Sequence, residues 1–490
     1  MKFLSLSAAL CGLLFSSIAA QSSTRTRGVT TLSIVSHAQT SATISSVAAR
    51  RVVLQNGLTL VTQIDRTSPR VAISLLVRAG ATDETSQNAG WRRLLAEAML
   101  RATQSGGNSV TIAARNRQLE DLGGRLGASV SDDAIEFWAT GESQNANDLL
   151  DLLLQTVRSP RLSEADVQAA RQSLTARRTA NADEVTTLAT GALAGQLFRD
   201  AQGQPLAYGL PLLGTDASLS SLSSTRLRDL QKQFFVPSRF TVGATGDLDE
   251  VNLRSHLAAL GVPATPNATQ NAAFNAPPLF APRTASEPIV IAQTSLIPGD
   301  WVFLSYRLPA ADDADAPALS VLAAALGSAP QSRLSKRLLT PVQTTANIES
   351  APKSPTQPPL PRNAQPPAQQ ASAALTPRRY GGDLTLFALT GASNAEQLRQ
   401  AMRDEVHRLS ATPLSAAELE AARRFAVGDW ALGGENLRDR AFRLASDEAL
   451  GIAQGSNWTS RLQNVSAGDV QRVAQKYLAN EATVIVRATS

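Results

Sequence analysis

Histidine, the residue that most often binds a metal, is scarce in this chain: its 490 residues include only His37, His256 and His407. A zinc site built on one helix needs two imidazoles about one turn apart, so that both rings face the metal. No two histidines are that close, and the single cysteine, Cys11, lies in an apolar N-terminal run. The sequence therefore contains no His/Cys zinc cluster, and it also lacks a Gly-x-Ser-x-Gly elbow and a phosphate loop.

One segment has the frame of a metal-binding helix but carries other residues. The sequence AGWRRLLAEAMLRATQSGG (89–107) predicts an amphipathic helix over 91–102. Arg93 and Glu97 are four residues apart and so are neighbours on a helix surface, where an exposed ion pair contributes about 0.3–0.5 kcal/mol. We interpret the segment as a scaffold helix with a surface ion pair, because it also has an apolar face made by Trp91, Leu94, Leu95, Ala98 and Met99.

The net charge of +5 does not indicate nucleic-acid binding. Five of the 46 basic residues lie within residues 1–64, which contain no acid, so the rest of the chain balances its 41 acidic residues. A basic tail on a neutral body is not the electrostatic footprint of a protein that binds DNA or RNA.

The N-terminus has the pattern of an export signal. Lys2 precedes an apolar run that ends in the small residues Ala19 and Ala20 before Gln21. We predict a signal peptide at 1–20, a disordered Ser/Thr/Arg-rich tail at 21–49, and a secreted or periplasmic protein without a transmembrane segment in its mature chain. A mitochondrial location is the alternative, because the residues after the apolar run are acid-free and rich in Ser, Thr and Arg.

From residue 51 the sequence predicts regular elements. A hairpin turns at Asn56-Gly57, and a buried strand follows within 69–80. A helix stops at Gly123-Gly124 and is followed by strands. The whole stretch 162–198 is predicted to be helical, with Ser163 as its N-cap.

The order of elements occurs twice. LSEADVQAAR (162–171) matches LSAAELEAAR (414–423) at six of ten positions, and Val242 aligns with Ile485 at the same offset that pairs Leu230 with Val473. A repeat of this length indicates a domain duplication rather than a solenoid. We predict domains at 50–261 and 289–490, joined by a Pro/Ala/Asn-rich linker at 262–288. A Pro/Gln-rich stretch at 350–378 is predicted to be a disordered insertion in the second domain.

Together with the duplication, several motifs resemble the M16 metallopeptidase family, which includes pitrilysin, insulin-degrading enzymes, the mitochondrial processing peptidase and core subunits of the cytochrome bc1 complex. The motifs are LQNGLTLV (54–61), LEDLGGRLGASVSDDAIEFWA (119–139), YGLPLLGT (208–215) and FVPSRFTVGATGDLD (235–249). The resemblance implies an α+β fold of two homologous M16-type (LuxS/MPP-like) domains, each a mainly antiparallel sheet covered by helices.

Catalytic members of the family carry His-x-x-Glu-His on the helix after the second strand, and a Glu on a later helix completes the zinc site. On this sequence Arg93 takes the first His position, Ala96 the Glu and Glu97 the second His, while the later helix (167–182) contains no acid. The resemblance thus implies a degenerate zinc site, and we predict no catalytic residues, no metal and no cofactor.

Non-catalytic members of the family usually act as partners of active ones, closing a chamber around a peptide. Such a partner contributes an Arg and a Tyr from its C-terminal half, but the corresponding segment here (332–346) has Leu339 at the Arg position and a threonine in place of the Tyr. The remaining candidates for holding a peptide are Lys336, Arg337, Arg379 and Tyr380.

We therefore predict a catalytically inactive M16-like subunit that forms a heterodimer with an active M16 peptidase. Two alternatives stay open. One is a peptidase with a non-standard metal site, which would need His256 or His407 to meet acids from the other half. The other is a structural core subunit of a mitochondrial respiratory complex or processing peptidase.

Overall fold

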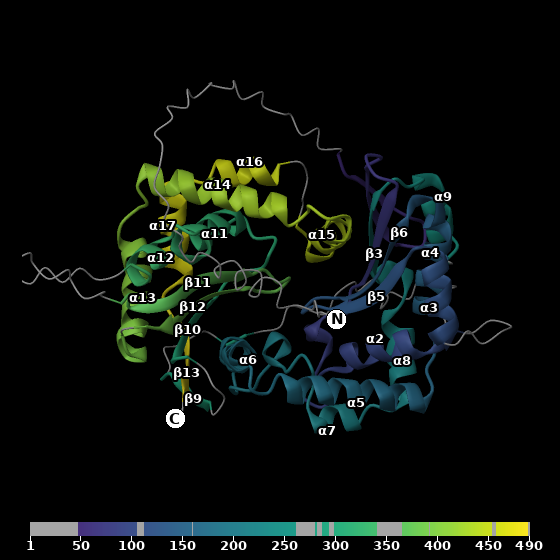
Figure 1. Cartoon of the computed structure of the whole chain (residues 1–490), viewed down its shortest axis with the longest axis horizontal. Helices are drawn as coiled ribbons and strands as arrows, with labels where there is room; N and C mark the ends of the chain where they lie inside the picture. The colour runs from purple at the N-terminus through teal and green to yellow at the C-terminus, as the bar shows by residue number, and fades with distance from the viewer. Residues whose placement is uncertain are drawn as a thin grey trace, which may run out of the picture. The chain divides into compact units, whose positions relative to one another are not determined.

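The computed structural model describes residues 48–104, 112–158, 160–260, 280–281, 287–293, 298–340, 365–391, 393–452 and 457–488 (Figure 1). The predicted signal peptide and nearly all of the predicted tail lie outside these residues, as does most of the predicted linker.

The described residues form one sheet in each half of the chain and a short two-stranded ribbon. The first sheet has the order β1 (Arg50–Val53), β2 (Thr59–Ile64), β8 (Phe240–Gly246), β3 (Arg70–Val77), β6 (Ile135–Glu142) and β5 (Arg125–Val130). The second has the order β11 (Ala368–Thr376), β12 (Asp383–Thr390), β10 (Trp301–Arg307), β13 (Ala482–Ala488) and β9 (Ile289–Gln293). The ribbon pairs β4 (Thr103–Gln104) with β7 (Pro160–Arg161).

The second sheet repeats the topology of five strands of the first, whose sixth strand, β1, has no counterpart in it. The order β2-β8-β3-β6-β5 corresponds to β9-β13-β10-β12-β11, and in each sheet one parallel pair (β2 with β8, β9 with β13) is followed by antiparallel pairs. Val242 lies opposite Leu75 in the first sheet, and Ile485 lies opposite Val302 in the second. The predicted fold of two homologous, mainly antiparallel α+β domains is confirmed.

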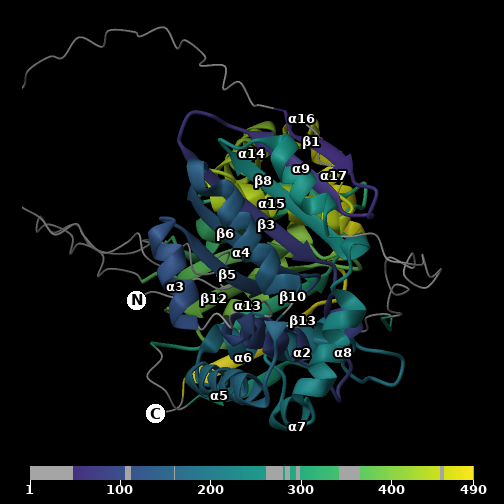
Figure 2. The same ribbon diagram turned by 90° about the vertical axis from the view of Figure 1, so that its right-hand side faces the viewer.

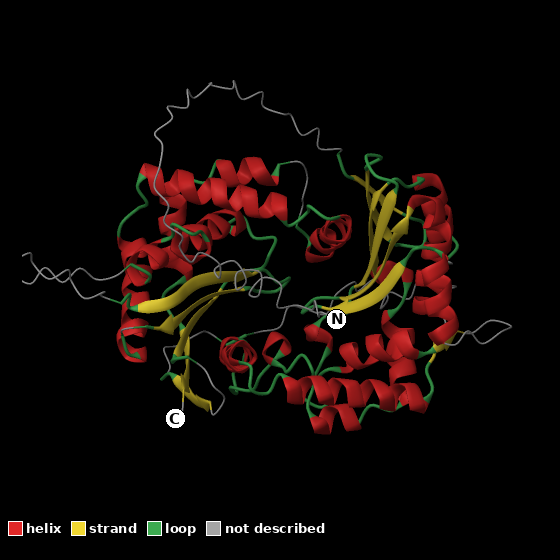
Figure 3. Ribbon diagram, viewed as in Figure 1, coloured by secondary structure: helices red, strands yellow, loops and turns green. Residues whose placement is uncertain are grey.

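Helices cover the outer faces of both sheets (Figure 3). The helices of the first half, including those that do not lie on an outer face, are α2 (Trp91–Arg101), α3 (Ile112–Asp121), α4 (Ala146–Arg158), α5 (Glu164–Ala180), α6 (Val185–Leu197), α7 (Asp216–Ser220), α8 (Ser224–Phe234) and α9 (Glu250–Ala258). In the second half they are α11 (Ala316–Ala323), α12 (Arg333–Leu338), α13 (Ala395–Ala411), α14 (Ala416–Leu432), α15 (Leu437–Leu450), α16 (Trp458–Gln463) and α17 (Ala467–Tyr477). Short helical turns occur at Ala81–Asp83, Ser143–Asn145, Ala207–Gly209, Pro237–Arg239 and Ala324–Ser328.

One helix from each half packs on the sheet of the other half. Helix α15 packs on β3 and β8 of the first sheet, and α6 packs on β10 and β13 of the second (Figures 1 and 2). This exchange explains why the central strands are buried on both faces. In β3, Leu75 belongs to the main core of the first half, whereas the next residue, Leu76, packs with Ala445 and Ala449 of α15.

Local sequence signals position several elements as predicted. Gly57 (φ 84°) forms the turn between β1 and β2, and Gly123 (φ 58°) follows α3. At the start of α5, the Oγ of Ser163 accepts a 3.1 Å hydrogen bond from the amide of Asp166, whose carboxylate in turn accepts one from the amide of Ser163.

Two predictions about elements are wrong. The stretch 162–198 is two helices, because Asn181 ends α5 and Glu184 caps α6, and residues such as Asn and Asp compete for backbone hydrogen bonds. The predicted disordered insertion (350–378) includes β11 at Ala368–Thr376. Its alanines and Leu375 pair along β12, a pattern that the Pro/Gln-rich composition concealed. Residues 341–364 lie outside the described part.

Among the described residues, no helix combines the length and the apolar character needed to cross a membrane.

Candidate functional site

Helix α2 is held in place by its apolar face and by a glycine at its start. The five residues predicted for that face, from Trp91 to Met99, are all buried. Gly90 has φ 84° and its Cα lies so close to Gly214 that an added Cβ would come within 2.7 Å of the Gly214 amide. The backbone at the start of α2 therefore requires glycine.

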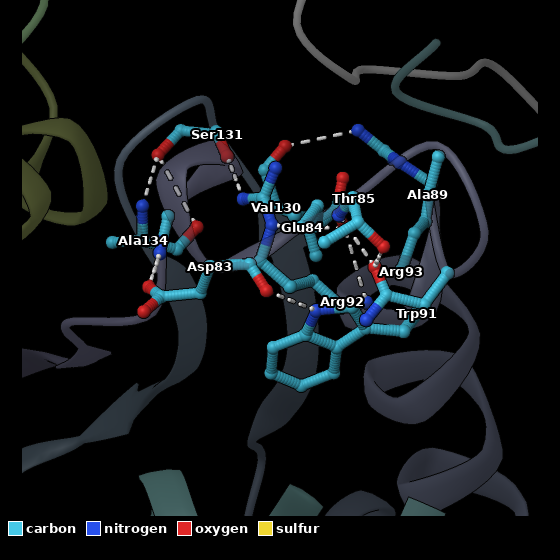
Figure 4. Close-up of polar contacts among 12 residues, drawn as sticks. Asp83, Glu84, Thr85, Ala89, Trp91, Arg92, Arg93, Val130, Ser131 and Ala134 are labelled. Carbon is cyan, nitrogen blue, oxygen red and sulfur yellow. Dashed lines mark hydrogen bonds and ion pairs between the residues drawn. The ribbon is translucent and has the colours of Figure 1, made fainter. Parts of the chain in front are cut away.

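A buried ion pair fixes the first turn of α2. The Nε of Arg92 lies 3.1 Å from Glu84, with both side chains almost fully buried, and its Nη1 donates a 2.5 Å hydrogen bond to the carbonyl of Ser131 (Figure 4). Because Ser131 directly follows β5, the hydrogen bond from Arg92 to Ser131 connects α2 to the edge strand of the sheet.

The surface ion pair predicted between Arg93 and Glu97 is wrong. Arg93 is only 8% exposed, and its Nη2 donates a 2.9 Å hydrogen bond to the carbonyl of Val130 at the end of β5 (Figure 4). Glu97 pairs instead with Arg101, at 3.2 Å, and with Arg177 of α5. Burial, together with the charges of Arg177 and Arg92, lowers the pKa of Arg93 to about 10.

These residues line a pocket of about 300 Å³ between α2, β5 and α5. Its lining is Arg93, Ala96, Glu97, Leu100, Arg101, Ala128, Ser129, Val130 and Arg177. The three positions predicted to mark a degenerate metal site therefore share one pocket, to which sequence reasoning had not assigned Arg101 and Arg177. Arg101 could have been found from its i+4 spacing to Glu97, but Arg177 is 80 residues from Glu97 and has no local signal.

The side chains of this pocket do not fit a zinc ion. Zinc in proteins takes imidazole, thiolate or carboxylate ligands, whereas the lining offers three guanidiniums and one carboxylate, which is already paired with two of them. Neither of the two histidines in the described part belongs to the pocket lining: His256 on α9 lies 3.9 Å from Asp151, and His407 is on α13. The described residues contain no group of three or more His, Cys, Asp or Glu side chains placed to hold a metal.

A second buried polar cluster joins the two halves. Arg378, just after β11, pairs with Asp132 of the first half and Asp383 of the second and lies over the ring of Tyr208. The Tyr208 hydroxyl donates a 2.5 Å hydrogen bond to Asp133. Burial raises the pKa of Asp133, and although burial opposes it, the charges of Asp132 and Asp383 raise the pKa of Arg378.

The residues predicted to hold a peptide lie in two separate places. Arg337 on α12 pairs with Asp404 and Glu405 of α13, and Lys336 lines a different pocket of about 260 Å³ beside α14. Arg379 and Tyr380 lie in the turn between β11 and β12, where the Arg379 amide donates a 3.1 Å hydrogen bond to Asp133. The role of all four in holding a peptide stays a prediction.

A mostly apolar pocket of about 190 Å³ lies where α15 meets the rest of the second half. Its lining includes Trp430, Trp458, Leu319, Arg443 and Asp447. Burial raises the pKa of the Asp447 carboxyl from an ordinary value of 3.8 to about 7, against the opposing charge of Arg443.

Asp447 should make the protein less stable as the pH rises from about 4 to 7. Over this range the unfolded chain releases the Asp447 proton while the folded chain keeps it, so the unfolded state gains relative stability. The Asp447→Asn variant should therefore unfold at a higher urea concentration than the parent at pH 8, and at about the same urea concentration as the parent at pH 4. Urea titrations at both pH values test this, with the exposed Glu120→Gln variant as control for the loss of one charge. An equal gain at both pH values would contradict it.

Family models match most of the described chain. Residues 59–209 match insulinase (peptidase family M16), and residues 221–357 match the peptidase M16 inactive domain. A protein of Mycobacterium bovis named an uncharacterized zinc protease is 24% identical over 444 residues, which is 89% of this chain and 92% of that protein. A probable mitochondrial-processing peptidase subunit beta of Arabidopsis thaliana is 22% identical over 287 residues, covering 58% of this chain and about half (51%) of that relative.

The fold is also similar to a solved structure. The crystal structure of a protease from Helicobacter pylori aligns with a TM-score of 0.75 and 18% identity, over 90% of this chain and 99% of that one. At this identity the likeness concerns the fold, and it extends over both halves.

Proposed function

Because the chain belongs to the M16 peptidase family, we propose that it is a catalytically inactive subunit that pairs with a separate zinc-dependent M16 peptidase and assists peptide binding or chamber formation. The observation that supports the proposal is the pocket beside α2, which is lined by Arg93, Ala96 and Glu97. The family resemblance aligns these residues with the first histidine, the catalytic glutamate and the second histidine of the zinc motif, in that order. A guanidinium is always protonated near neutral pH and offers no lone pair to a metal.

The chemistry of the pocket gives a second reason. Zinc-dependent hydrolysis needs a metal-bound water and a base to take its proton. Ala96 has no ionisable group, and the two carboxylate oxygens of Glu97 already accept hydrogen bonds from Arg101 and Arg177. A peptidase reaction at this pocket would therefore lack both metal and base.

A partner role accounts for why such a chain retains the two-domain fold. The match to a protein named as a subunit of the mitochondrial processing peptidase supports assembly with another chain of the same family. The same match favours a second candidate, a subunit of a mitochondrial complex. N-terminal sequencing of the mature protein separates the two, because a start at Gln21 in a bacterial periplasm would exclude the mitochondrial candidate.

The test is an affinity pull-down of the tagged chain from its native extract, with zinc analysis and a peptide-hydrolysis assay on the eluate. We expect a second M16-type chain that contains His-x-x-Glu-His and about one zinc, and peptide hydrolysis only when both chains are present. The purified chain alone should contain less than about a tenth of an equivalent of zinc.

Two outcomes would overturn the proposal. One is a purified chain that binds one equivalent of zinc and cleaves peptides in a chelator-sensitive manner, which would show a rearranged metal site. The other is a chain that neither binds an active M16 subunit nor changes the activity of one.

A further inference from the structure

The pocket beside α2 has an excess of positive charge. It contains the guanidiniums of Arg93 and Arg101 from α2 and of Arg177 from α5, against the single carboxylate of Glu97. Glu97 is ion-paired with two of these cations, so the third, Arg93, has no carboxylate partner among the described residues. Like charges gathered in a partly closed pocket repel one another more strongly than they would in open water.

Arg93 also has unused hydrogen-bond donors. Its guanidinium carries five N–H groups, and within the described part of the chain it donates one hydrogen bond, to Val130. The side chain is more than nine-tenths buried, and its Nε has no hydrogen-bond partner among the described residues. The Nε of Arg101, which also lines the pocket, is likewise buried and has no partner in the described part of the chain. Buried donors are nearly always satisfied in folded proteins, so this cluster lacks an acceptor.

From this geometry we propose that the pocket is an oxyanion-binding site that takes a carboxylate of a peptide, from either an acidic side chain or a C-terminus. The assignment to a peptide rests on the proposed function, whereas the anion site itself rests only on the pocket. It replaces recognition by a metal with recognition by arginines at the same place in the fold.

The pocket suits a carboxylate for three reasons. A guanidinium presents paired N–H groups in one plane, which match the two oxygens of a carboxylate. A volume of about 300 Å³ accommodates one side chain or chain end rather than a large ligand. Leu100, Ala96 and Ala128 add an apolar wall against which the aliphatic stem of an acidic residue can pack.

The charge balance of the pocket also favours an anion. Burial and the charges of Arg177 and Arg92 lower the pKa of Arg93 more than the opposing charges of Glu97 and Asp132 raise it, so the protonated guanidinium is destabilised where it lies. A bound carboxylate would offset this repulsion and supply the missing acceptor. Ser129 also lines the pocket, but it does not donate a hydrogen bond to the anion, because its hydroxyl already donates a 2.6 Å hydrogen bond to Glu136.

The experiment measures binding of octapeptides that carry an uncharged boron-dipyrromethene dye at the N-terminus to the purified chain by fluorescence anisotropy. Three peptides have the same Ala/Gly/Gln background: one with a single Glu and an amidated C-terminus, one with Gln in its place and an amidated C-terminus, and one with Gln and a free C-terminus. We expect one of the two carboxylate peptides to bind at least tenfold more tightly than the amidated Gln peptide, which also identifies the source of the carboxylate. Equal affinity for all three would overturn the proposal.

Variants then locate the site. Arg93→Gln should abolish the tenfold preference, and Arg177→Gln, which changes a partly exposed side chain, should reduce it. The control is Arg424→Gln on α14, whose side chain is 73% exposed and which should leave the preference unchanged. A full preference retained in Arg93→Gln or in Arg177→Gln, with the parent's thermal midpoint, would show that the carboxylate binds elsewhere and would overturn the assignment.

This test is independent of the partner role. The purified chain is used alone, so a carboxylate preference that disappears in Arg93→Gln and weakens in Arg177→Gln would support the anion site even if no partner subunit were found. Conversely, a partner recovered in the pull-down together with equal affinity for all three peptides would leave the proposed function standing and remove the anion site.

Discussion

Replacing Arg378 by methionine should lower the free energy of unfolding by about 3–5 kcal/mol. The Arg378 side chain is 11% exposed and forms ion pairs with Asp132 and Asp383. Methionine fills a similar volume but leaves both carboxylates without their cation in a poorly hydrated site. Removing one member of a buried charge cluster costs more than the cluster contributes, because the remaining charges keep their desolvation penalty.

The loss of stability in Arg378→Met should affect both halves of the chain. Asp132 lies in the turn between β5 and β6 of the first half, while Arg378 and Asp383 flank the turn between β11 and β12 of the second. Asp133 and Tyr208 belong to the same cluster, so a displaced turn would also weaken their 2.5 Å hydrogen bond. The variant should therefore become more sensitive to proteolysis in both halves.

Urea unfolding followed by circular dichroism tests this prediction. The control is Arg66→Met, which removes an exposed cation 3.6 Å from Asp247 and should cost less than about 1 kcal/mol. The double variant Arg378→Met/Asp383→Asn should recover part of the loss, because it removes one of the unpaired charges. A loss for Arg378→Met no larger than for Arg66→Met would contradict the prediction.

The elements that could be predicted from the sequence are those fixed by neighbouring residues. The Asn56-Gly57 turn, the capping box at Ser163 and the apolar face of α2 each depend on residues within a few positions of one another. The duplication was also readable, because homologous residues such as Val242 and Ile485 keep equivalent places in the two sheets. These features were sufficient to predict the fold and the helix that carries the predicted degenerate zinc site.

The other features of the fold and of the site depend on contacts between segments that are far apart in the sequence, and local sequence patterns do not indicate such contacts. The sequence of α6 shows that it is largely apolar, but nothing in it indicates that it packs on the sheet of the other half. The ion-pair partner of Glu97 is a second example. The four-residue spacing predicted that Glu97 pairs with Arg93, but it pairs with Arg177 of α5, which is 80 residues away in the sequence. Spacing also could not show that Arg93 is buried, because burial depends on where β5 lies.

Exchange of helices between the halves leads to the second large effect. Gly243 in β8 faces α15 so closely that a Cβ added to it would overlap the carbonyl oxygen of Ala441 and lie 2.8 Å from the amide nitrogen of Ala445. Both atoms belong to the helix backbone and cannot rotate away as a side chain would. Gly243→Ala should therefore force α15 away from the sheet and lower the free energy of unfolding by about 3 kcal/mol.

Helix α15 cannot retreat without breaking further contacts. Arg438 donates a 2.7 Å hydrogen bond to Glu136, which is buried in the first sheet, and Arg440 pairs with Asp65 at 2.9 Å. A shift of the helix would stretch both ion pairs and leave the Glu136 carboxylate less well satisfied. For this reason the cost should exceed that of an ordinary overpacked site where one side chain can move.

The matched control is Gly428→Ala in the middle of α14, where an added Cβ would meet nothing within 4 Å. The same chemical change should there stabilise the protein by up to about 1 kcal/mol, because alanine is the better helix former. Urea unfolding should thus give opposite signs for the two variants, and limited proteolysis should cut α15 faster in Gly243→Ala. If Gly243→Ala were as stable as the parent, α15 would not be packed on β8 as described, and the exchange of helices that joins the two halves would be in error.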